Sequence, residues 1–496
     1  MTQSELSSSV NKSLLRGTAW MIGARWLTRC IGLVSMVILA RLLAPEDYGL
    51  VAMAMLAYGL LETIAYAGVD LALMRQGADT RAHYDTAWTV QLIQNCVVAA
   101  LLLIAAPLTA AYFSEPRAVA VIQLIALRSV IEGAQNIGIV AFRKELDFAK
   151  EFRFMLYNKL ANFIVIVAAA YWFRNYWALV IGSVSASVIG LMLSYAMHPY
   201  RPRLSLAKSK EIWSFSQWLM ISRVGSFLNR KADEFIVGGA AGTAAIGAYH
   251  FASDLATTPS IEVVMPMRRA LFPSLAKLTS QPDQFARMVR DSFSSVAVLC
   301  FSVGFGLMAV APEFVQVFLG PKWVETVPLI QWLAVFGAFT GLTLLLEVPL
   351  WVSGRTKWTA LQTWLELAAL VPAAWFAVHE FGIVGAAAAR TCVAITMVPI
   401  MMHISVRAGS VSYTDLIGAV WRPLLSGALM ALTLYALVLP ATMSPVAAFS
   451  IKVLLGMGAF PAILIILWWA SGRPTGFEAS ALGKASALLA GRKSVP

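Results

Sequence analysis

The chain of 496 residues is too apolar for a water-soluble protein, with 59% hydrophobic residues, 13% charged residues and a mean hydropathy of +0.73. Soluble domains carry about a quarter charged residues, so a soluble enzyme or binding domain is excluded. The formal net charge of +12 leaves nucleic acid and anionic lipid as partner classes, and the positions of the cations decide between them.

Apolar stretches long enough to cross a bilayer recur along almost the whole chain. A spanning helix needs about 20 apolar residues, and the polar segment 1–17 ahead of the first stretch lacks a signal-peptide pattern. We therefore predict an all-α integral membrane protein with about fourteen transmembrane helices. In chain order the predicted spans are 18–41, 47–68, 86–112, 117–141, 152–172, 177–197, 213–239, 243–266, 288–312, 326–349, 359–378, 382–404, 417–439 and 448–469.

Lysine and arginine are distributed unevenly between alternate loops, and this asymmetry predicts the orientation. With the N-terminus in the cytoplasm, most of the loop cations fall on the inner side. An even number of spans then places both termini in the cytoplasm. The basic charge serves topology, so nucleic acid is discarded as a partner. The outer loops hold only Arg41, Arg117, Arg174 and Lys322.

Two segments of the chain resemble each other. ILARLLAPEDYGLVAMA, from Ile38, overlays IVGGAAGTAAIGAYHFA, from Ile236, and places Gly49 on Gly247. Six predicted spans separate the copies, and an even offset predicts parallel repeats around a shared cavity. Chance similarity between two helical hairpins is the alternative. We predict two parallel six-helix lobes around a central cavity: a cytoplasmic N-terminal segment 1–17, an N-lobe 18–200, a C-lobe 201–404, two C-terminal helices within 405–470, and a cytoplasmic tail 471–496.

Ionisable residues inside spans need a partner or a wet cavity, because each costs about 2.5–3.5 kcal/mol at mid-bilayer. Arg25 and Arg29 are four residues apart on one helix face, with no carboxylate nearby in sequence. Such a pair is suited to an anion, and the planar guanidinium fits a phosphate. The alternative is that Glu62 in the next span neutralises them. Arg128 and Glu132, also four apart, can satisfy each other.

The second half of the chain has an acidic surplus within its spans. A carboxylate in a low-dielectric cavity has a raised affinity for protons, so these groups are candidates to couple transport to a cation. The alternative is that they pair with arginines of the same half. The charged run from Arg230 to Glu234 is predicted to form a solvated rim near a span end. The candidate substrate-binding cations are Arg25, Arg29, Arg128, Arg223 and Arg390, and the candidate counter-ion or coupling groups are Glu62, Asp254, Glu347 and Glu366.

The sequence holds no motif for chemistry. It has no GxxxxGK[ST] phosphate loop, no HExxH, no paired-cysteine metal site and no long outer loop that would hold an active site. We therefore expect no catalytic residue, no metal and no cofactor other than a proton or sodium gradient. Transport is the function that remains. A membrane scaffold or a polymerase of polysaccharide assembly is the alternative from another class.

Two hairpins carry a resemblance to a known family. RGTAWMIGARWLTRCIGLVSMVILARLLAPEDYGLVAMA, followed by GVDLALMRQ, and later KADEFIVGGAAGTAAIGAYHFASDLATTPSIEV, resemble the Wzx-type polysaccharide flippases, particularly the branch with the colanic acid exporters. The most specific parts are the R-L-L-x-P-x-D-Y-G turn and the G-x-x-x-x-G-A-Y hairpin. The resemblance covers nearly the whole chain in length and span order.

The resemblance implies the fold of the multidrug/oligosaccharidyl-lipid/polysaccharide (MOP) exporter superfamily. It also implies a flippase of the bacterial cytoplasmic (inner) membrane that turns an undecaprenyl-pyrophosphate-linked oligosaccharide repeat unit from the inner to the outer leaflet by alternating access. The product would enter exopolysaccharide or lipopolysaccharide synthesis, with membrane lipids, a polymerase and chain-length or export proteins as partners. Related flippases use cations of the first helix, which Arg25 and Arg29 match by depth. A cation-coupled multidrug exporter of the same fold is the alternative.

Overall fold

The structure is a computed structural model that describes residues 23, 27–66, 68–69, 73, 80–145, 147–409, 411–437, 439–440, 442–474 and 478, with the backbone alone for 148 and 210–222. Arg25 lies outside the described residues. Across these residues the regular structure is helical, and no strand is formed. The all-α prediction is confirmed. A helix satisfies every backbone group within its own segment, which hydrocarbon requires.

The chain folds into two compact units. Unit 1 consists of the chain up to Lys231 together with Gly242–Gly247, and unit 2 consists of Ala232–Ala241 and the chain from Ala248 onward. The predicted domain boundary at 200/201 differs from this division, because residues 201–231 go with unit 1. The turn Gly242–Gly247 also belongs to unit 1, although both helical segments that flank it belong to unit 2.

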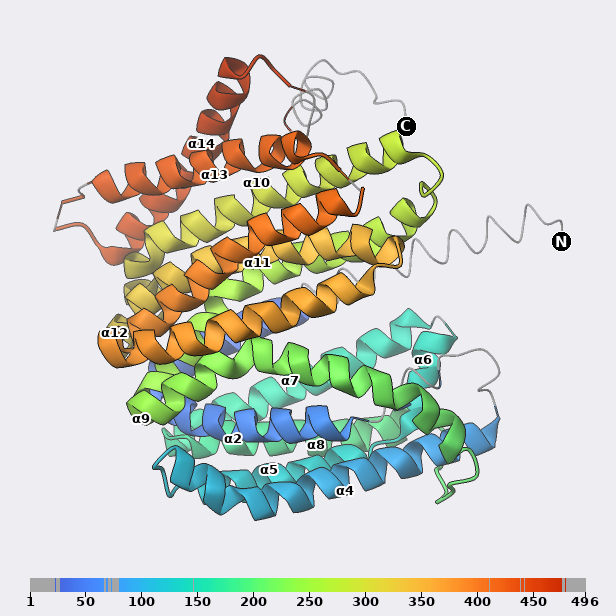
Figure 1. Ribbon diagram of the computed structural model, residues 1–496. Helices are drawn as coiled ribbons and strands as arrows, with labels where there is room; N and C mark the ends of the chain where they lie inside the picture. The colour runs from blue at the N-terminus through green and yellow to red at the C-terminus, as the bar shows by residue number, and fades with distance from the viewer. Residues whose placement is uncertain are drawn as a thin grey trace. The chain divides into compact units, whose positions relative to one another are not determined.

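In unit 1, α5 packs against α4 and α8, and α2 contacts all three of these helices (Figure 1). Its core holds alanine, valine, leucine and isoleucine side chains, among them Leu50, Leu102 and Ile122. α5 ends at Gly133, and the Asn136 side chain then accepts from the Gly138 N–H to begin η1. The described helices of the unit are α2 (Pro45–Ala65), α4 (Arg81–Tyr112), α5 (Ala118–Gly133), η1 (Ile137–Ile139), α6 (Val140–Lys144), α7 (Phe148–Phe173), α8 (Trp177–Met197) and the first part of α9 (Ser209–Ala276).

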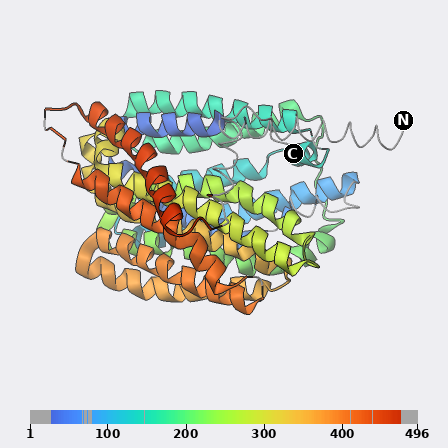
Figure 2. The ribbon, with the colours of Figure 1, turned by 90° about the horizontal axis from the view of Figure 1, so that it is seen from above.

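In unit 2, α10 packs against α11 and α13, and an apolar core lies between α10, α13 and α14. α14 runs obliquely to α13 (Figures 1 and 2). Prolines occupy the first positions of α10 and α14, where the missing N–H leaves no bond unmade. The described helices are the rest of α9, α10 (Pro282–Phe314), the π-helix η2 (Val315–Leu319), η3 (Pro321–Thr326), α11 (Val327–Val352), α12 (Thr356–Arg407), α13 (Tyr413–Ala436) and α14 (Pro445–Ala470).

Ten of the described helices are long and apolar enough to cross a membrane, and the pair formed by α5 with η1 and α6, bent by 63°, is an eleventh candidate. α9 and α12 are each broken by a glycine of positive φ, Gly242 at 83° and Gly382 at 65°. Counting both parts of each gives 10 + 2 = 12 spans, or 13 with the bent pair. The protein is a multi-pass membrane protein. The number fourteen stays a prediction, because part of span 18–41 lies outside the described residues.

The two hairpin turns that resemble each other in sequence touch reciprocally within unit 1. A Cβ built on Gly49 would stand 1.8 Å from the carbonyl oxygen of Thr243, and a Cβ built on Gly247 would stand 1.9 Å from that of Pro45. Pro45 and Thr243 each precede their glycine by four residues, so the contacts are those of a two-fold pair. We call these two turns the glycine clasp. Its symmetry supports the overlay of Gly49 on Gly247 that the sequence predicted.

The glycine clasp is tied to the loop between α4 and α5. The Thr243 hydroxyl donates to the Glu115 carboxylate at 2.9 Å, and Arg117 donates to the same carboxylate at 2.7 Å. The hydrogen bonds from Arg117 lower the pKa of Glu115 to about 2. Glu115 is therefore ionised near neutral pH and anchors the turn of α9 on unit 1.

Candidate functional site

Unit 1 contains a polar cavity of about 440 Å³ between α2, α4, the end of α5, η1, α6 and the start of α7. This volume is within the range of small-molecule sites, about 300–1,000 Å³. We call it the unit 1 cavity. In a helical unit built for hydrocarbon, so many polar side chains in one place need a hydrated or ligand-filled space. The acidic and amide side chains in its lining are Glu62, Gln91, Gln94, Asn95, Glu132 and Gln135, with Asn136 and Glu151 toward α6 and α7.

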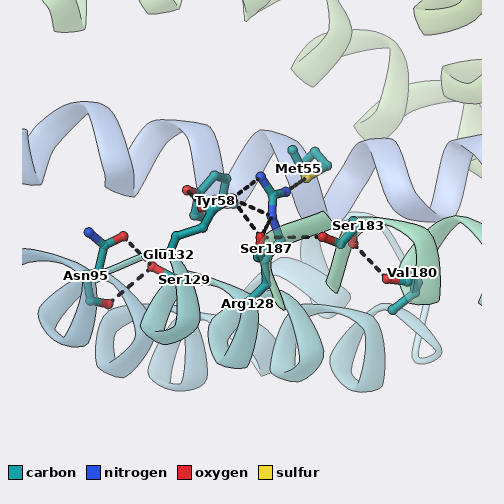
Figure 3. Close-up of polar contacts among 9 residues, drawn as sticks. All are labelled: Met55, Tyr58, Asn95, Arg128, Ser129, Glu132, Val180, Ser183 and Ser187. Carbon is teal, nitrogen blue, oxygen red and sulfur yellow. Dashed lines mark hydrogen bonds and ion pairs between the residues drawn. The ribbon is translucent and has the colours of Figure 1, made fainter. Parts of the chain in front are cut away.

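Glu132 of α5 lines the cavity and forms an ion pair with Arg128 on the same helix (Figure 3). Arg128 donates to Glu132 Oε1 at 2.9 and 3.1 Å, and Ser187 of α8 donates to the same oxygen at 2.9 Å. The hydroxyl of Tyr58 on α2 donates to Glu132 Oε2 at 3.0 Å, and the Arg128 guanidinium lies 5.2 Å from the Tyr58 ring centroid. Arg128 and Glu132 satisfy each other, as their spacing allowed. Whether Arg128 also binds substrate stays a prediction.

Amide side chains on one face of α4 line the cavity. Gln91, Gln94 and Asn95 are three and four residues apart, so they share a helix face. Gln91 Nε2 lies 3.2–3.4 Å from three carbonyl oxygens at the end of α5, and Ser129 donates to Asn95 Oδ1 at 3.1 Å. These bonds satisfy carbonyl groups that the break in α5 exposes. This amide face was not predicted from the sequence, although three amides at helical spacing inside an apolar span were a signal for it.

The remaining predicted residues of unit 1 lie on three elements. Arg29 is half-buried, and its positive charge acts on Lys159 of α7, whose ammonium lies 3.8 Å from a Cβ built on Gly32. The Arg223 guanidinium lies 3.5 Å from the ring centroid of Tyr66. Glu62 is exposed on the cavity wall, where the charges of Arg128 and Arg223 act on it. Arg29 therefore has a second cation for a neighbour, a combination suited to an anion.

In unit 2, a buried pair replaces the predicted solvated rim. Asp233 is 3% exposed and Glu234 is 1% exposed, so the prediction of a solvated rim was wrong for these two carboxylates, whereas Arg230 is exposed. Arg390 lies 3.7 Å from Asp233 Oδ2, which accepts from the Tyr249 hydroxyl at 2.7 Å, and His250 lies 3.0 Å from Glu234. Tyr249 and Arg390 reach Oδ2 of Asp233, and His250 reaches Oε2 of Glu234, so partners from other turns offset part of the cost of burying these carboxylates.

The three predicted coupling carboxylates of unit 2 have different surroundings. Glu347 pairs with Arg268 at 2.5 Å, and both side chains are largely buried. Arg268 was expected in a loop because the predicted span ended at 266, whereas α9 continues to Ala276. Glu366 accepts from Gln362 at 2.7 Å, and Asp254 is an exposed side chain 3.9 Å from His250. Among the described residues, no group of three or more metal-binding side chains is assembled.

Comparisons with known proteins settle the family. A family profile described as "Polysaccharide biosynthesis protein" matches residues 38–328, more than half of the chain. The chain belongs to the polysaccharide biosynthesis protein family. This match confirms the resemblance to Wzx-type flippases that the two hairpins indicated, and it includes both turns of the glycine clasp.

Named relatives of this family lie at low identity. The chain is 24% identical to the lipopolysaccharide biosynthesis protein WzxC of Escherichia coli (strain K12) over 66% of this chain and 68% of the relative. It is 24% identical to the succinoglycan biosynthesis transport protein ExoT of Rhizobium meliloti (strain 1021), over 66% and 67%. It is 21% identical to the teichuronic acid biosynthesis protein TuaB of Bacillus subtilis (strain 168), over 66% and 69%.

Solved structures show the fold. The lipid II flippase MurJ, in an inward closed conformation, matches with a TM-score of 0.73 at 14% identity, over 92% of this chain and all of that chain. An inward-facing multidrug MATE transporter of the MOP superfamily matches with a TM-score of 0.59 at 14% identity, over 77% and 95%. This member of the polysaccharide biosynthesis protein family therefore has the all-α fold of the MOP exporters.

Proposed function

We propose that the protein is a flippase that turns a polyprenyl-pyrophosphate-linked oligosaccharide repeat unit from the inner to the outer leaflet of the bacterial cytoplasmic membrane. The observation that carries the proposal is the unit 1 cavity, a polar space among membrane-spanning helices. A hydrophilic cargo needs such a space to cross hydrocarbon. Family membership and relatives named for the biosynthesis or transport of three polysaccharides support the same cargo class.

The proposed transport cycle is alternating access by a multi-pass protein with both termini in the cytoplasm. The proposal assigns the pyrophosphate to the first helix, through Arg25 and Arg29, together with Lys159 of α7, on which the charge of Arg29 acts. Arg128 and Arg390 already have carboxylate partners at 2.9 and 3.7 Å, so they offer an anion less net charge. The exported repeat unit would pass to a polymerase and to chain-length or export proteins.

The fate of the lipid-linked repeat unit in cells that lack this protein tests the proposal. We expect the repeat unit to accumulate in the inner leaflet and polymer synthesis to stop, because a charged sugar headgroup crosses hydrocarbon too slowly by itself. A probe that reaches only the outer leaflet measures the distribution. Normal outer-leaflet exposure, in a strain without a redundant flippase, contradicts the proposal.

The double substitution Arg25→Ala/Arg29→Ala tests the pyrophosphate site. We expect export to be abolished at an unchanged protein level, since the double variant lacks two charge-assisted contacts to phosphate, each worth about 1.5–3 kcal/mol. Arg287→Ala removes an exposed cation of α10 and serves as the matched control. Full export by the double variant removes both arginines from the site.

Coupling to a proton or sodium gradient is a second part of the proposal. Glu62 in the unit 1 cavity and Asp254, Glu347 and Glu366 in unit 2 are its candidates, because a carboxylate in a membrane unit can exchange a cation with whichever side the cavity faces. We expect transport into proteoliposomes to slow several-fold when ionophores collapse both gradients. Transport rates that stay unchanged after both gradients have collapsed rule coupling out.

A cation-coupled multidrug exporter is the second candidate function. The fold shared with a multidrug MATE transporter favours it, together with the exposed carboxylate of Glu62 on the cavity wall, which would attract a cationic drug. Resistance conferred on a drug-sensitive host supports this reading. An unchanged drug sensitivity, with loss of polymer in the deletion strain, supports the flippase.

A further inference from the structure

Two polar side chains of the unit 1 cavity make no hydrogen bond or ion pair with any part of the chain that the structure describes. They are the carboxylate of Glu62 and the amide of Gln135. The other amides and carboxylates of the lining have partners. Gln91 and Asn95 bond to α5, Glu132 pairs with Arg128, and Arg143 of α6 pairs with Glu151 of α7.

Glu62 and Gln135 lie near the two ends of one hydrogen bond, which joins Tyr58 of α2 to Glu132 of α5. Tyr58 and Glu62 lie one turn apart on α2, and Glu132 and Gln135 lie three residues apart across the end of α5. The Tyr58 hydroxyl donates to Glu132 at 3.0 Å and ties these two places together. Glu62 and Gln135 therefore belong to one region of the cavity wall.

The chemistry of this region suits hydroxyl groups. An amide offers one acceptor and two donors, and a carboxylate accepts from two neighbouring hydroxyls. A polar group that loses its water without a new partner costs free energy, so a ligand that displaces water here has to supply donors and acceptors. Sugar hydroxyls supply both. The partly exposed ring of Phe154 in the same lining offers an apolar face for a sugar ring.

The charge of the lining argues against the phosphate end of a substrate. Glu62, Glu132 and Glu151 line the cavity with Arg143, and Arg128 beside the cavity neutralises Glu132. The Glu62 carboxylate has no ion-pair partner in the described residues, although the charges of Arg128 and Arg223 act on it. The cavity therefore offers an anion no surplus of positive charge, and an uncharged sugar needs none.

We propose that the unit 1 cavity binds an uncharged sugar of the repeat unit, with Glu62 and Gln135 as hydrogen-bonding and specificity-determining residues. This inference rests on the proposed function and adds to it a division of labour within unit 1. The cations of the first helix and α7 bind the pyrophosphate, and the cavity between α2, α4 and α5 binds the sugar and determines which sugar is accepted. A change of repeat unit among relatives then requires changes in the amide lining.

Binding to two lipid probes tests the division. The full-length protein in detergent micelles is titrated with undecaprenyl pyrophosphate that carries no sugar and with undecaprenyl pyrophosphate that carries one neutral hexose. We expect the unaltered chain to prefer the hexose probe. Gln135→Ala and Glu62→Ala are each expected to lower the affinity for the hexose probe roughly five- to tenfold, the effect of one lost hydrogen bond. The affinity for the bare probe should not change.

Controls separate this inference from folding and from the proposed function. Gln284→Ala removes an exposed amide of α10 and should change neither affinity, and a thermal unfolding midpoint checks that each variant is folded. Three results contradict the sugar site and leave the flippase proposal intact. They are an equal loss of affinity for both probes, an unchanged affinity for the hexose probe, and a higher affinity of Glu62→Ala for the bare probe. Failure of the unaltered chain to bind either probe contradicts the flippase proposal itself.

Discussion

Replacing Gly49 with alanine is expected to destabilise the protein by about 3 kcal/mol or more, an effect at the upper end of overpacking. The new Cβ would stand 1.8 Å from the Thr243 carbonyl oxygen, a backbone atom that cannot rotate away. The two turns of the glycine clasp would have to separate. Gly247→Ala should cost a similar amount, because its Cβ would meet the Pro45 carbonyl oxygen at 1.9 Å.

The double variant Gly49→Ala/Gly247→Ala should lose less unfolding free energy than the sum of the losses in the two single variants. Once one Cβ has separated the turns, the second enters space that is already open, so the effects are not additive. The measurements are the level of folded protein in membranes and the unfolding midpoint in detergent.

Gly458→Ala in α14 is the matched control for the clasp. A Cβ there meets nothing within 4 Å, and alanine favours a helix over glycine by up to about 1 kcal/mol. If Gly49→Ala proves as stable as Gly458→Ala, the two turns do not touch, and the two-fold pairing of the hairpins is wrong.

The spans of this protein were predictable from the sequence because the length of an apolar stretch is a local property. The predicted span 177–197 coincides with α8, and the predicted break at 379–381 ends one residue before the turn at Gly382. The bend after Gly133 was not predicted. Its cause is a set of hydrogen bonds between distant parts of the chain, in which Gln91 donates to the Gly133 carbonyl oxygen and the Asn136 side chain donates to the Tyr200 carbonyl oxygen.

The ion pairs also divide into those that local sequence spacing predicts and those that only the tertiary fold brings together. Arg128 and Glu132 are one helical turn apart, so sequence spacing alone predicts that they meet. Glu347 and Arg268, by contrast, meet across two helices, and no periodicity connects them. The roles of Glu62 and Gln135 in the unit 1 cavity could not be predicted from the sequence either. A side chain is recognised as unpartnered only after the partners of its neighbours are known.

Breaking the buried pair of Asp233 and Arg390 is the second large effect that we expect. Arg390→Met leaves the carboxylate, 3% exposed, with the Tyr249 hydroxyl as its remaining described partner. Removing one member of a buried pair costs about 3–5 kcal/mol, because the other charge remains desolvated. Asp233→Leu should cost a similar amount for the same reason.

The double variant Asp233→Leu/Arg390→Met should recover most of the stability, since apolar side chains of similar size often replace a buried ion pair at little cost. Lys150→Met is the control, because Lys150 is half exposed beside Asp147 and such pairs contribute about 0–1 kcal/mol. Export then separates the two roles of Arg390. A double variant that is stable but inactive assigns the guanidinium to the substrate path, whereas one that is stable and active makes the pair purely structural and removes Arg390 from the predicted site.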